Sequence, residues 1–262
     1  MFGDIVGEIR DNRLLLAKIL IHQNQQKTNC KNLSDYEFKV FSQCGEDGIL
    51  QHLISVINIE NETFIEFGVQ NYIESNTRFL LINNNWRGLV FDGSSKNINY
   101  IKNDQIYWQF SLIAEHLFID KNNINERIKK NNLSGDVGLL SIDIDGNDYW
   151  IWDAISVIQP RIIVCEYNSL FGYKAPITVP YRPDFNRTEA HYSNLYFGAS
   201  ISALTILAKE KGYSLVASNS EGSNIFFVRN DLMKNLKELS PKEAYVRSKF
   251  RESRDPDGQM TF

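Results

Sequence analysis

Short apolar runs alternate with amphipathic stretches between residues 62 and 166. Five runs have the length of a strand and are rich in Val, Ile and Phe: Thr63–Val69, Gly88–Asp92, Ile106–Phe110, Val137–Ile144 and Arg161–Glu166. Stretches with helical spacing lie between them, at about 75–83, 96–103, 122–131 and 149–157. This alternation predicts βαβ units and a parallel sheet. The nearly continuous apolar runs are typical of strands that are buried on both faces.

The pattern changes toward the C-terminus. Ser200–Lys211 has helical spacing, and two strand-like segments, Tyr213–Ala217 and Asn224–Arg229, flank the turn Ser218–Gly222. Two strands joined by a short turn rich in Asn, Ser and Gly predict an antiparallel hairpin. We therefore expect an α/β fold with a Rossmann-like, seven-stranded, mostly parallel sheet that ends in this hairpin.

Three segments lie outside the alternating pattern. Residues 4–25 predict an amphipathic helix, which could pack on the domain or on a second subunit. Residues 169–198 hold three prolines and several tyrosines, and an irregular stretch of this length is usually functional. We divide the chain into an N-terminal helical extension (1–40), a main domain (41–240) and a tail (241–262). We expect the tail to be solvated, and the alternative is that it reaches a neighbouring subunit or covers the active site.

Composition restricts the classes of function. The chain has 262 residues, of which 43% are hydrophobic and 23% charged, enough for the core of a globular protein. The formal net charge of -4 does not suggest a basic face for nucleic acid. Three scattered cysteines make a disulfide framework or a cysteine zinc site unexpected. We find neither a secretory signal nor an apolar run long enough to span a membrane, and we expect a cytoplasmic protein.

Two predicted strands end in residues that suit a ligand. The first ends in Glu66-Phe67-Gly68 and the second in Asp92-Gly93. A glycine after a strand lets a ligand approach the backbone, and a carboxylate about 20 residues further on can bind a ribose. The alternative is that both glycines only make turns and that Asp92 caps a helix. No further glycine follows Gly68 in the next ten residues, which disfavours a dinucleotide and favours S-adenosylmethionine.

Four runs resemble bacterial class I S-adenosylmethionine-dependent methyltransferases: 42–50, 64–69, 88–94 and 141–150. The resemblance covers about residues 40–230 and is nearest to the FkbM-like and macrocin-type O-methyltransferases. Within that group the chain looks like enzymes that methylate sugar hydroxyls, including nucleotide-linked heptoses, for capsular or surface polysaccharide. The resemblance therefore implies the class I methyltransferase fold, S-adenosylmethionine as the cofactor, and a sugar-nucleotide or other glycan acceptor, which residues 169–198 would enclose.

The resemblance also implies which residues contact the cofactor. The chain departs from many relatives at Gln70-Asn71, where these have a further glycine. The implied cofactor contacts are Gln43, Gly45, Glu66, Gly68, Asn76, Asp92, Gly93, Ser94 and Asp143.

Acidic residues gather where the fourth and fifth strands are expected to end. Asp143, Asp145 and Asp148 follow the fourth strand, and Glu166 ends the fifth. Carboxylates of Asp145 and Glu166 at one sheet edge would suit Mg²⁺ or Mn²⁺. Macrocin-type enzymes are metal-dependent, and the resemblance implies the same pair, although Asn147 stands where they have an aspartate. The alternative is a turn and a helix cap, for which Asp and Asn are common.

A metal-free mechanism would need a general base. Asp148 and His191 are the candidates for this base. Together with Asp145 at the end of the fourth strand, they form the predicted catalytic set. Basic residues of the segment 169–198 could meet the phosphates of a sugar nucleotide: Lys174, Arg182 and Arg187. Two other functions stay open, a nicotinamide-dependent sugar-nucleotide oxidoreductase and an inactive methyltransferase-like interaction module. The sequence also leaves a homo-oligomer open.

Overall fold

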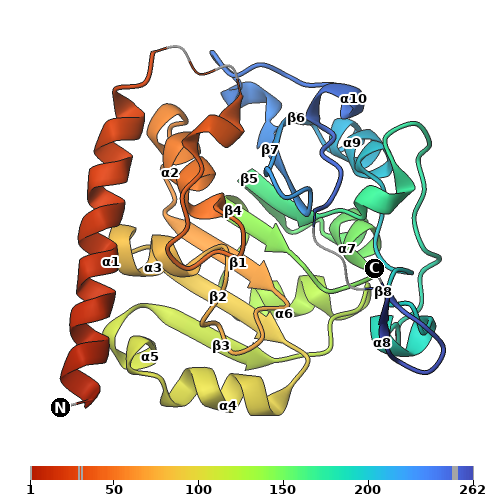
Figure 1. Ribbon diagram of the computed structural model, residues 1–262, viewed down its shortest axis with the longest axis horizontal. Helices are drawn as coiled ribbons and strands as arrows, with labels where there is room; N and C mark the ends of the chain where they lie inside the picture. The colour runs from red at the N-terminus through yellow and green to blue at the C-terminus, as the bar shows by residue number, and fades with distance from the viewer. Residues whose placement is uncertain (1, 29, 31, 250–252, 262) are drawn as a thin grey trace.

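Seven strands form one sheet in a computed structural model that describes residues 2–28, 30, 32–249 and 253–261 (Figure 1). The sheet order is β3-β2-β1-β4-β5-β7-β6. Strands β1 to β5 pair in parallel, and β7 pairs antiparallel with both β5 and β6. The strands are β1 (Thr63–Phe67), β2 (Arg87–Asp92), β3 (Leu112–His116), β4 (Gly135–Ile142), β5 (Ile158–Glu166), β6 (Tyr213–Ser218) and β7 (Asn224–Arg229). This order confirms the predicted Rossmann-like sheet with its terminal hairpin.

Helices cover both faces of the sheet. Alternate strand residues point to opposite faces, so Phe64 lies in the core beneath α2, α3 and α4, and Ile65 in the core beneath α6, α7 and α9. The α-helices are α1 (Phe2–Gln25), α2 (Glu46–Val56), α3 (Arg78–Asn84), α4 (Ser95–Asn103), α5 (Gln105–Gln109), α6 (Ile124–Lys130), α7 (Asp148–Ala154), α8 (Arg187–Ala190), α9 (Ile201–Glu210) and α10 (Pro241–Ala244). Short 3₁₀ helices are η1 (Leu33–Tyr36), η2 (Ser169–Phe171) and η3 (Asn230–Leu232). A separate hairpin pairs β8 (Ser253–Arg254) with β9 (Met260–Thr261).

The predicted third strand is wrong. Residues 106–110 lie in or directly after α5, and the strand itself begins at Leu112. Asp104 caps this helix, because its side chain accepts a hydrogen bond from the Ile106 amide at 3.1 Å. The segments that form α5 and β3 are both short and rich in apolar residues, so their patterns look alike. The Asp104 cap is the signal that marks residues 105–109 as a helix.

Helix α2 has no counterpart among the predicted elements. It begins after Gly45, whose φ is 102° and whose missing side chain gives a weaker start signal than Ser or Asp would. The predicted N-terminal helix is confirmed as α1, of 24 residues. In the described part of the chain, none of the helices is long and apolar enough to span a membrane. Residues 1, 29, 31, 250–252 and 262 of the predicted extension and tail lie outside the described residues.

Candidate functional site

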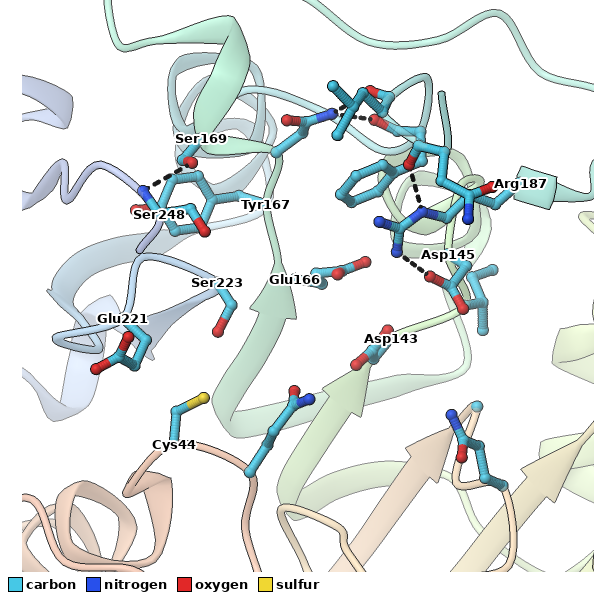
Figure 2. Close-up of a pocket in the computed structure, with 18 of the residues that line it drawn as sticks. Cys44, Asp143, Asp145, Glu166, Tyr167, Ser169, Arg187, Glu221, Ser223 and Ser248 are labelled. Carbon is cyan, nitrogen blue, oxygen red and sulfur yellow. Dashed lines mark hydrogen bonds and ion pairs between the residues drawn. The ribbon is translucent and has the colours of Figure 1, made fainter. Parts of the chain in front are cut away.

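A cavity of about 1250 Å³ lies where the parallel strands end (Figure 2). Residues that follow β1, β2, β4 and β5 line it, which is the edge at which open α/β sheets bind ligands. The other walls come from residues 37–45, from the segment 169–198, from the turn between β6 and β7, and from the tail. Of the predicted site residues, the lining includes Gln43, Gly45, Gly68, Asp92, Gly93, Asp143, Asp145 and Glu166.

Gly68 allows the ends of β1 and β4 to lie close together. Its φ is +73°, and a Cβ atom at this position would come within 1.6 Å of the carbonyl oxygen of Asp143. Its amide donates to the carbonyl of Phe91 at 2.9 Å. Any larger residue would force the two strand ends apart, so the glycine is required by the shape of the cavity floor.

Asp92 has a structural role at the cavity edge, and its predicted contact with a ribose stays a prediction. Its carboxylate accepts hydrogen bonds from the amides of Gln70 at 2.7 Å and Ser94 at 2.8 Å, and from the Asn97 side chain at 3.0 Å. These contacts fix the loop after β1 and the start of α4. A carboxylate has about four acceptor positions, so Asp92 can also accept from a ligand in the cavity that it lines.

Glu66 and Asn76 lie below the cavity rather than in its lining. The Glu66 carboxylate is buried and accepts hydrogen bonds from Ser75 Oγ at 2.6 Å, from the Asn76 amide at 2.9 Å and from the Thr77 hydroxyl. Burial raises the pKa of Glu66, and these hydrogen bonds oppose that rise. The Asn76 side chain donates to Ser141 at 3.1 Å. Both residues therefore hold the loop between β1 and α3.

The wall at residues 40–45 is held by a second buried carboxylate. Asp47 accepts hydrogen bonds from the amides of Val40, Phe41 and Ser42 at 2.7 to 2.9 Å. Burial raises the pKa of Asp47 to about 6, against the effect of these three donors. The neighbouring Glu46 accepts from Asn219 and Asn224 at the β6–β7 turn, at 2.7 and 2.8 Å. These acids bring Gln43 and Gly45 to the cavity.

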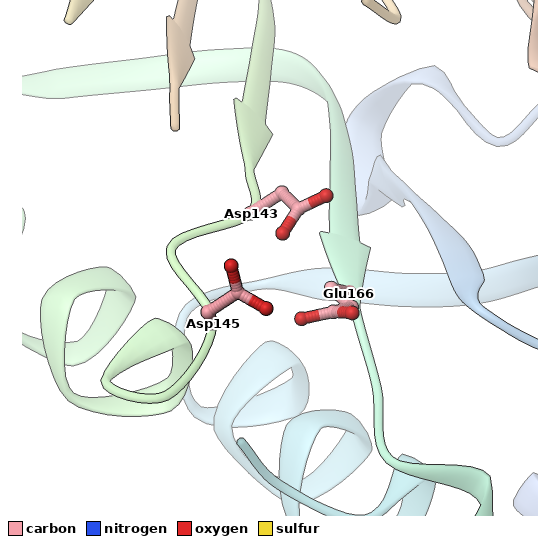
Figure 3. A group of neighbouring side chains, drawn as sticks. All are labelled: Asp143, Asp145 and Glu166. Carbon is pink, nitrogen blue, oxygen red and sulfur yellow. The ribbon is translucent and has the colours of Figure 1, made fainter. Parts of the chain in front are cut away.

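Three carboxylates converge at the centre of the cavity (Figure 3). One oxygen from each of Asp143, Asp145 and Glu166 lies within 4.8 Å of the other two. Burial raises the pKa of Asp143 and of Glu166 well above the usual range, and the neighbouring carboxylates add to the shift. Glu166 Oε2 is buried and has no hydrogen-bond partner among the described residues. The cluster thus brings three acidic groups together and leaves at least one carboxylate oxygen, Glu166 Oε2, unused.

Asp148 shapes the turn that carries Asp145. Its carboxylate accepts from the amides of Ile144 at 2.8 Å and Gly146 at 3.0 Å, and it does not belong to the cavity lining of the described residues. Burial raises the pKa of Asp148 to about 6. Asp145 itself adopts a left-handed backbone conformation with φ +57°, which directs its side chain toward the cluster (Figure 3).

Arg187 provides a positive charge at the acidic cluster. Its Nη1 donates to Asp145 Oδ1 at 2.6 Å, its Nε donates to the Asn194 carbonyl at 2.8 Å, and its guanidinium lies 3.8 Å from the centre of the Phe197 ring (Figure 2). The two other predicted phosphate contacts are absent from the described lining. Of these, Arg182 pairs with exposed Asp184 at 3.2 Å.

His191 makes no contact with the acidic cluster in the described structure. Its Nδ1 is 2.7 Å from the hydroxyl of Ser193, its ring packs on Tyr192, and the residue is exposed outside the lining of the described cavity. Ser94 also lies outside this lining, and its side chain caps α4 by accepting from the Asn97 amide at 3.4 Å. Their predicted contacts with a ligand remain predictions that no contact in the structure supports.

Sequence reasoning missed two parts of the lining. Phe118, 54% exposed, lies beside Gly93 in the cavity wall, and correct placement of β3 would have marked it as a residue that follows a strand. The tail was expected to be solvated, but its residues Arg247, Ser248, Ser253 and Thr261 line the cavity. Hydrogen bonds hold it there, among them Tyr245 Oη to the Ser169 carbonyl at 2.9 Å. No local sequence signal marked this long-range contact.

No known family model matches the chain, and no curated protein matches it. Solved structures do match. An O-methyltransferase from Bacillus cereus in complex with S-adenosylhomocysteine is 13% identical, with a TM-score of 0.44 over 83% of this chain and 91% of that one. An S-adenosylmethionine-dependent methyltransferase from Clostridium acetobutylicum is 10% identical, with a TM-score of 0.43 over 82% and 97%. Precorrin-6y C5,15-methyltransferase from Geobacter metallireducens is 11% identical, with a TM-score of 0.41 over 73% and 90%.

These matches concern the path of the backbone only. The fold assignment rests on the strand order of this sheet, and the activity proposed below rests on the residues of the cavity.

Proposed function

We propose that the protein is an S-adenosylmethionine-dependent O-methyltransferase that acts on a sugar hydroxyl with the help of a divalent cation. The acidic cluster of Asp143, Asp145 and Glu166 is the observation that carries this proposal. A buried carboxylate oxygen without a partner, as in Glu166, is costly unless a ligand completes its environment. The cluster also lies in the same cavity as Gly68 and Asp92.

The chemistry of the donor set fits Mg²⁺ or Mn²⁺. All three groups are hard oxygen ligands, and one oxygen of each lies within 4.8 Å of the others. A cation held by Asp143, Asp145 and Glu166 would lower the pKa of a sugar hydroxyl and orient it. Asp148 serves this site by holding the turn of Asp145 rather than by contacting a substrate.

The opposite half of the cavity suits the cofactor. S-adenosylmethionine supplies the methyl group, and we assign Asp92 to its ribose hydroxyls. Phe118 and Gly93 would pack against the adenine, since an aromatic ring beside a residue without a side chain suits a flat base. The backbone around Gly68 would approach the amino-acid part. Glu66 and Asp47 support these contacts from below by holding the two loops that surround them.

Polar groups that surround the cluster support a sugar as the acceptor. Hydroxyl and amide side chains line this half of the cavity: Asn168, Ser169, Asn186, Thr188, Asn194, Ser223 and Ser248. Such groups match the alternating hydroxyls of a carbohydrate, and Arg187 adds a donor for phosphate. We propose a nucleotide-linked sugar, such as a heptose destined for capsule or surface polysaccharide.

Catalysis in this proposal depends mainly on position. Methyl transfer to an alcohol needs the sulfonium, the methyl carbon and the oxygen in line, and holding two reactants in this way removes much of the entropic barrier. The segment 169–198 and the tail exclude water from the acceptor half, because Phe185, Phe197 and Ser248 all come to the lining. The hydroxyl proton leaves to a neighbouring acceptor oxygen of the cluster.

Calorimetric titration with S-adenosylhomocysteine and then with NADH tests the proposal, each with and without Mn²⁺. Saturable binding of S-adenosylhomocysteine alone supports a methyltransferase and justifies a screen of nucleotide sugars for methyl transfer. Binding of NADH alone would overturn the cofactor assignment in favour of an oxidoreductase. Binding of neither would favour a non-enzymatic module.

Two variants locate the cofactor within the cavity. We expect Asp92→Ala to weaken S-adenosylhomocysteine about tenfold, which corresponds to about 1.4 kcal/mol. Phe118→Ala changes an exposed residue and is expected to weaken binding about fivefold without loss of stability. Asp153→Ala, on the exposed side of α7, is the matched control. Unchanged affinity in both variants, with normal melting, would refute the assignment of this half.

A further inference from the structure

Helix α1 has an apolar stripe on its outer side. Its side chains at Ile9, Leu15, Leu16, Ile19 and Leu20 are between 39% and 60% exposed. Residues on the opposite side hold the helix to the domain: Ala17 is buried, and Leu14 and Ile21 pack against the same cluster around Phe79. A helix at the surface of a monomer normally turns polar residues outward, whereas both sides of α1 are apolar.

The stripe has the spacing of a helix-pairing seam. Ile9, Asn12, Leu16 and Ile19 follow one another at intervals of three, four and three residues, and all four are exposed. Such intervals place a seam along one line of a helix, and they are typical of two helices that pack side by side. From Ile9 to Ile19 the seam extends over about 15 Å of the helix, and its four positions give four layers of contact.

We propose that a second copy of this chain covers the stripe, with the two α1 helices parallel and in register. Glu8 and Arg13 flank the seam on opposite sides and are five residues apart. In a parallel pair this spacing brings Glu8 of one copy to the partner's Arg13, and it brings Leu15 to the partner's Leu20 in the same way. Asn12 would meet the partner's Asn12, and a single polar pair in such a seam helps to set the register.

Arg13 can serve both its own domain and the partner. It already donates to the Val40 carbonyl and lies over the Phe41 ring, at 5.5 Å from the ring centre. A guanidinium has five donors, so these contacts leave others for a carboxylate of the partner subunit. Because Val40 leads directly into the cavity wall at Gln43, the pairing would also brace that wall.

The charge of α1 argues against a membrane as the occupant. The helix holds three acidic residues, Asp4, Glu8 and Asp11, against three basic ones, Arg10, Arg13 and Lys18, so that its formal charge is zero. Helices that lie on anionic lipid surfaces are usually rich in Lys and Arg on their polar face. A neutral helix with both signs beside its seam instead suits another copy of itself.

The oligomeric state of the full chain tests the proposal by sedimentation equilibrium. We expect a dimer for the wild type and a monomer for Leu16→Glu/Ile19→Glu. Ile206→Glu is the matched control, because Ile206 is 46% exposed on α9, on the opposite side of the molecule from α1 (Figure 1), and the change should leave the dimer intact. Leu16 and Ile19 are exposed in the single chain, so the double variant should stay folded as a monomer.

Oxidative cross-linking tests the parallel register. Asn12→Cys should form a disulfide-linked dimer, whereas Lys18→Cys, on the side of α1 away from the seam, should not. A monomeric wild type, or a double variant that still forms dimers, would overturn the proposal. Binding of the monomer to vesicles of phosphatidylglycerol would overturn it in favour of a lipid surface. A dimer in which Lys18→Cys cross-links and Asn12→Cys does not would overturn the parallel arrangement.

Discussion

Two groups of acidic residues at the cavity end of the sheet have opposite surroundings. Glu66, Asp47 and Asp148 each accept several hydrogen bonds from amides and hydroxyls of nearby loops. The cluster of Asp143, Asp145 and Glu166 faces a cavity, and Glu166 keeps a buried oxygen without a partner in the described chain. Both groups contain acids whose pKa is raised, chiefly by burial: Glu66, Asp47 and Asp148 in the first, and Asp143 and Glu166 in the second.

The difference lies in what satisfies the charge. Amides and hydroxyls of loops satisfy Glu66 and Asp148, and three amides hold Asp47 through Oδ2, so these acids determine the shape of the backbone. Asp47 Oδ1 is buried without a partner among the described residues, but Asp47 lies outside the described cavity lining. The acids of the second group repel one another and gain only one described arginine, at Asp145. We infer that hydrogen bonds from loop amides, together with a place outside the cavity lining, distinguish the structural acids from the functional ones better than the pKa shift does.

The largest expected effect belongs to Glu66→Ala. Removal of this carboxylate leaves the donors of Ser75, Asn76 and Thr77 buried without an acceptor, and we expect a loss of about 4 kcal/mol in the free energy of unfolding. Urea denaturation measures it. Glu62→Ala, exposed at the start of β1, should change stability by less than about 0.5 kcal/mol. Equal effects of the two variants would contradict the structural role of Glu66.

The pH dependence of stability gives the next effect. Burial raises the pKa of Asp47 to about 6 from a usual value of 3.8, so the folded protein binds an extra proton between these values. Stability should therefore fall as the pH rises from about 4 to about 6 and be level above that. The shift of about two units corresponds to at most about 3 kcal/mol.

The Asp47→Asn variant isolates this contribution. Its free energy of unfolding should lack the part of the slope that Asp47 supplies, when both proteins are unfolded in urea at a series of pH values. A wild-type stability that rises relative to the variant as the pH goes from about 4 to about 6 would show that the sign is wrong.

Asp145→Ala should next show that the acidic cluster binds a metal, unlike the acids that hold the loops. We expect Mn²⁺ affinity to fall at least about 100-fold, or about 2.7 kcal/mol, because one of three ligands is lost. Electron paramagnetic resonance of free Mn²⁺ measures this directly. Asp184→Ala, which changes an exposed acid of the segment 169–198, is the control. Binding of S-adenosylhomocysteine should persist in both variants, and unchanged Mn²⁺ affinity in Asp145→Ala would exclude the site.

Glu166→Gln should have the smallest effect, with a sign opposite to that of Glu66→Ala. It removes a group whose charged form is disfavoured by burial and by Asp143, so the free energy of unfolding should rise by about 0.5 to 1 kcal/mol. Thermal melting without added metal is sufficient to detect this. Destabilisation comparable to that of Glu66→Ala would mean that Glu166 is structural. The contrast between the loop-holding acids and the acidic cluster would then be wrong.

Local patterns predicted most of the sheet. The boundaries of β7 and of α4 lie within one residue of the prediction, because apolar runs and helical spacing are properties of neighbouring residues. The third strand was misplaced because one helix cap at Asp104 decides between two short apolar elements. That error also concealed Phe118, whose importance depends on its position directly after the strand.

The site was predicted in kind but not in arrangement. The sequence by itself determined that glycines and carboxylates follow the strands, since strand direction alone brings such residues to one edge of a parallel sheet. Only the tertiary structure decided which carboxylates face the cavity: Glu66 and Asp148 turn to loop amides, and Glu166 does not. It likewise brought the tail over the cavity. The physical reason is that hydrogen-bond satisfaction and burial depend on contacts between residues far apart in the chain, about which local patterns hold no information.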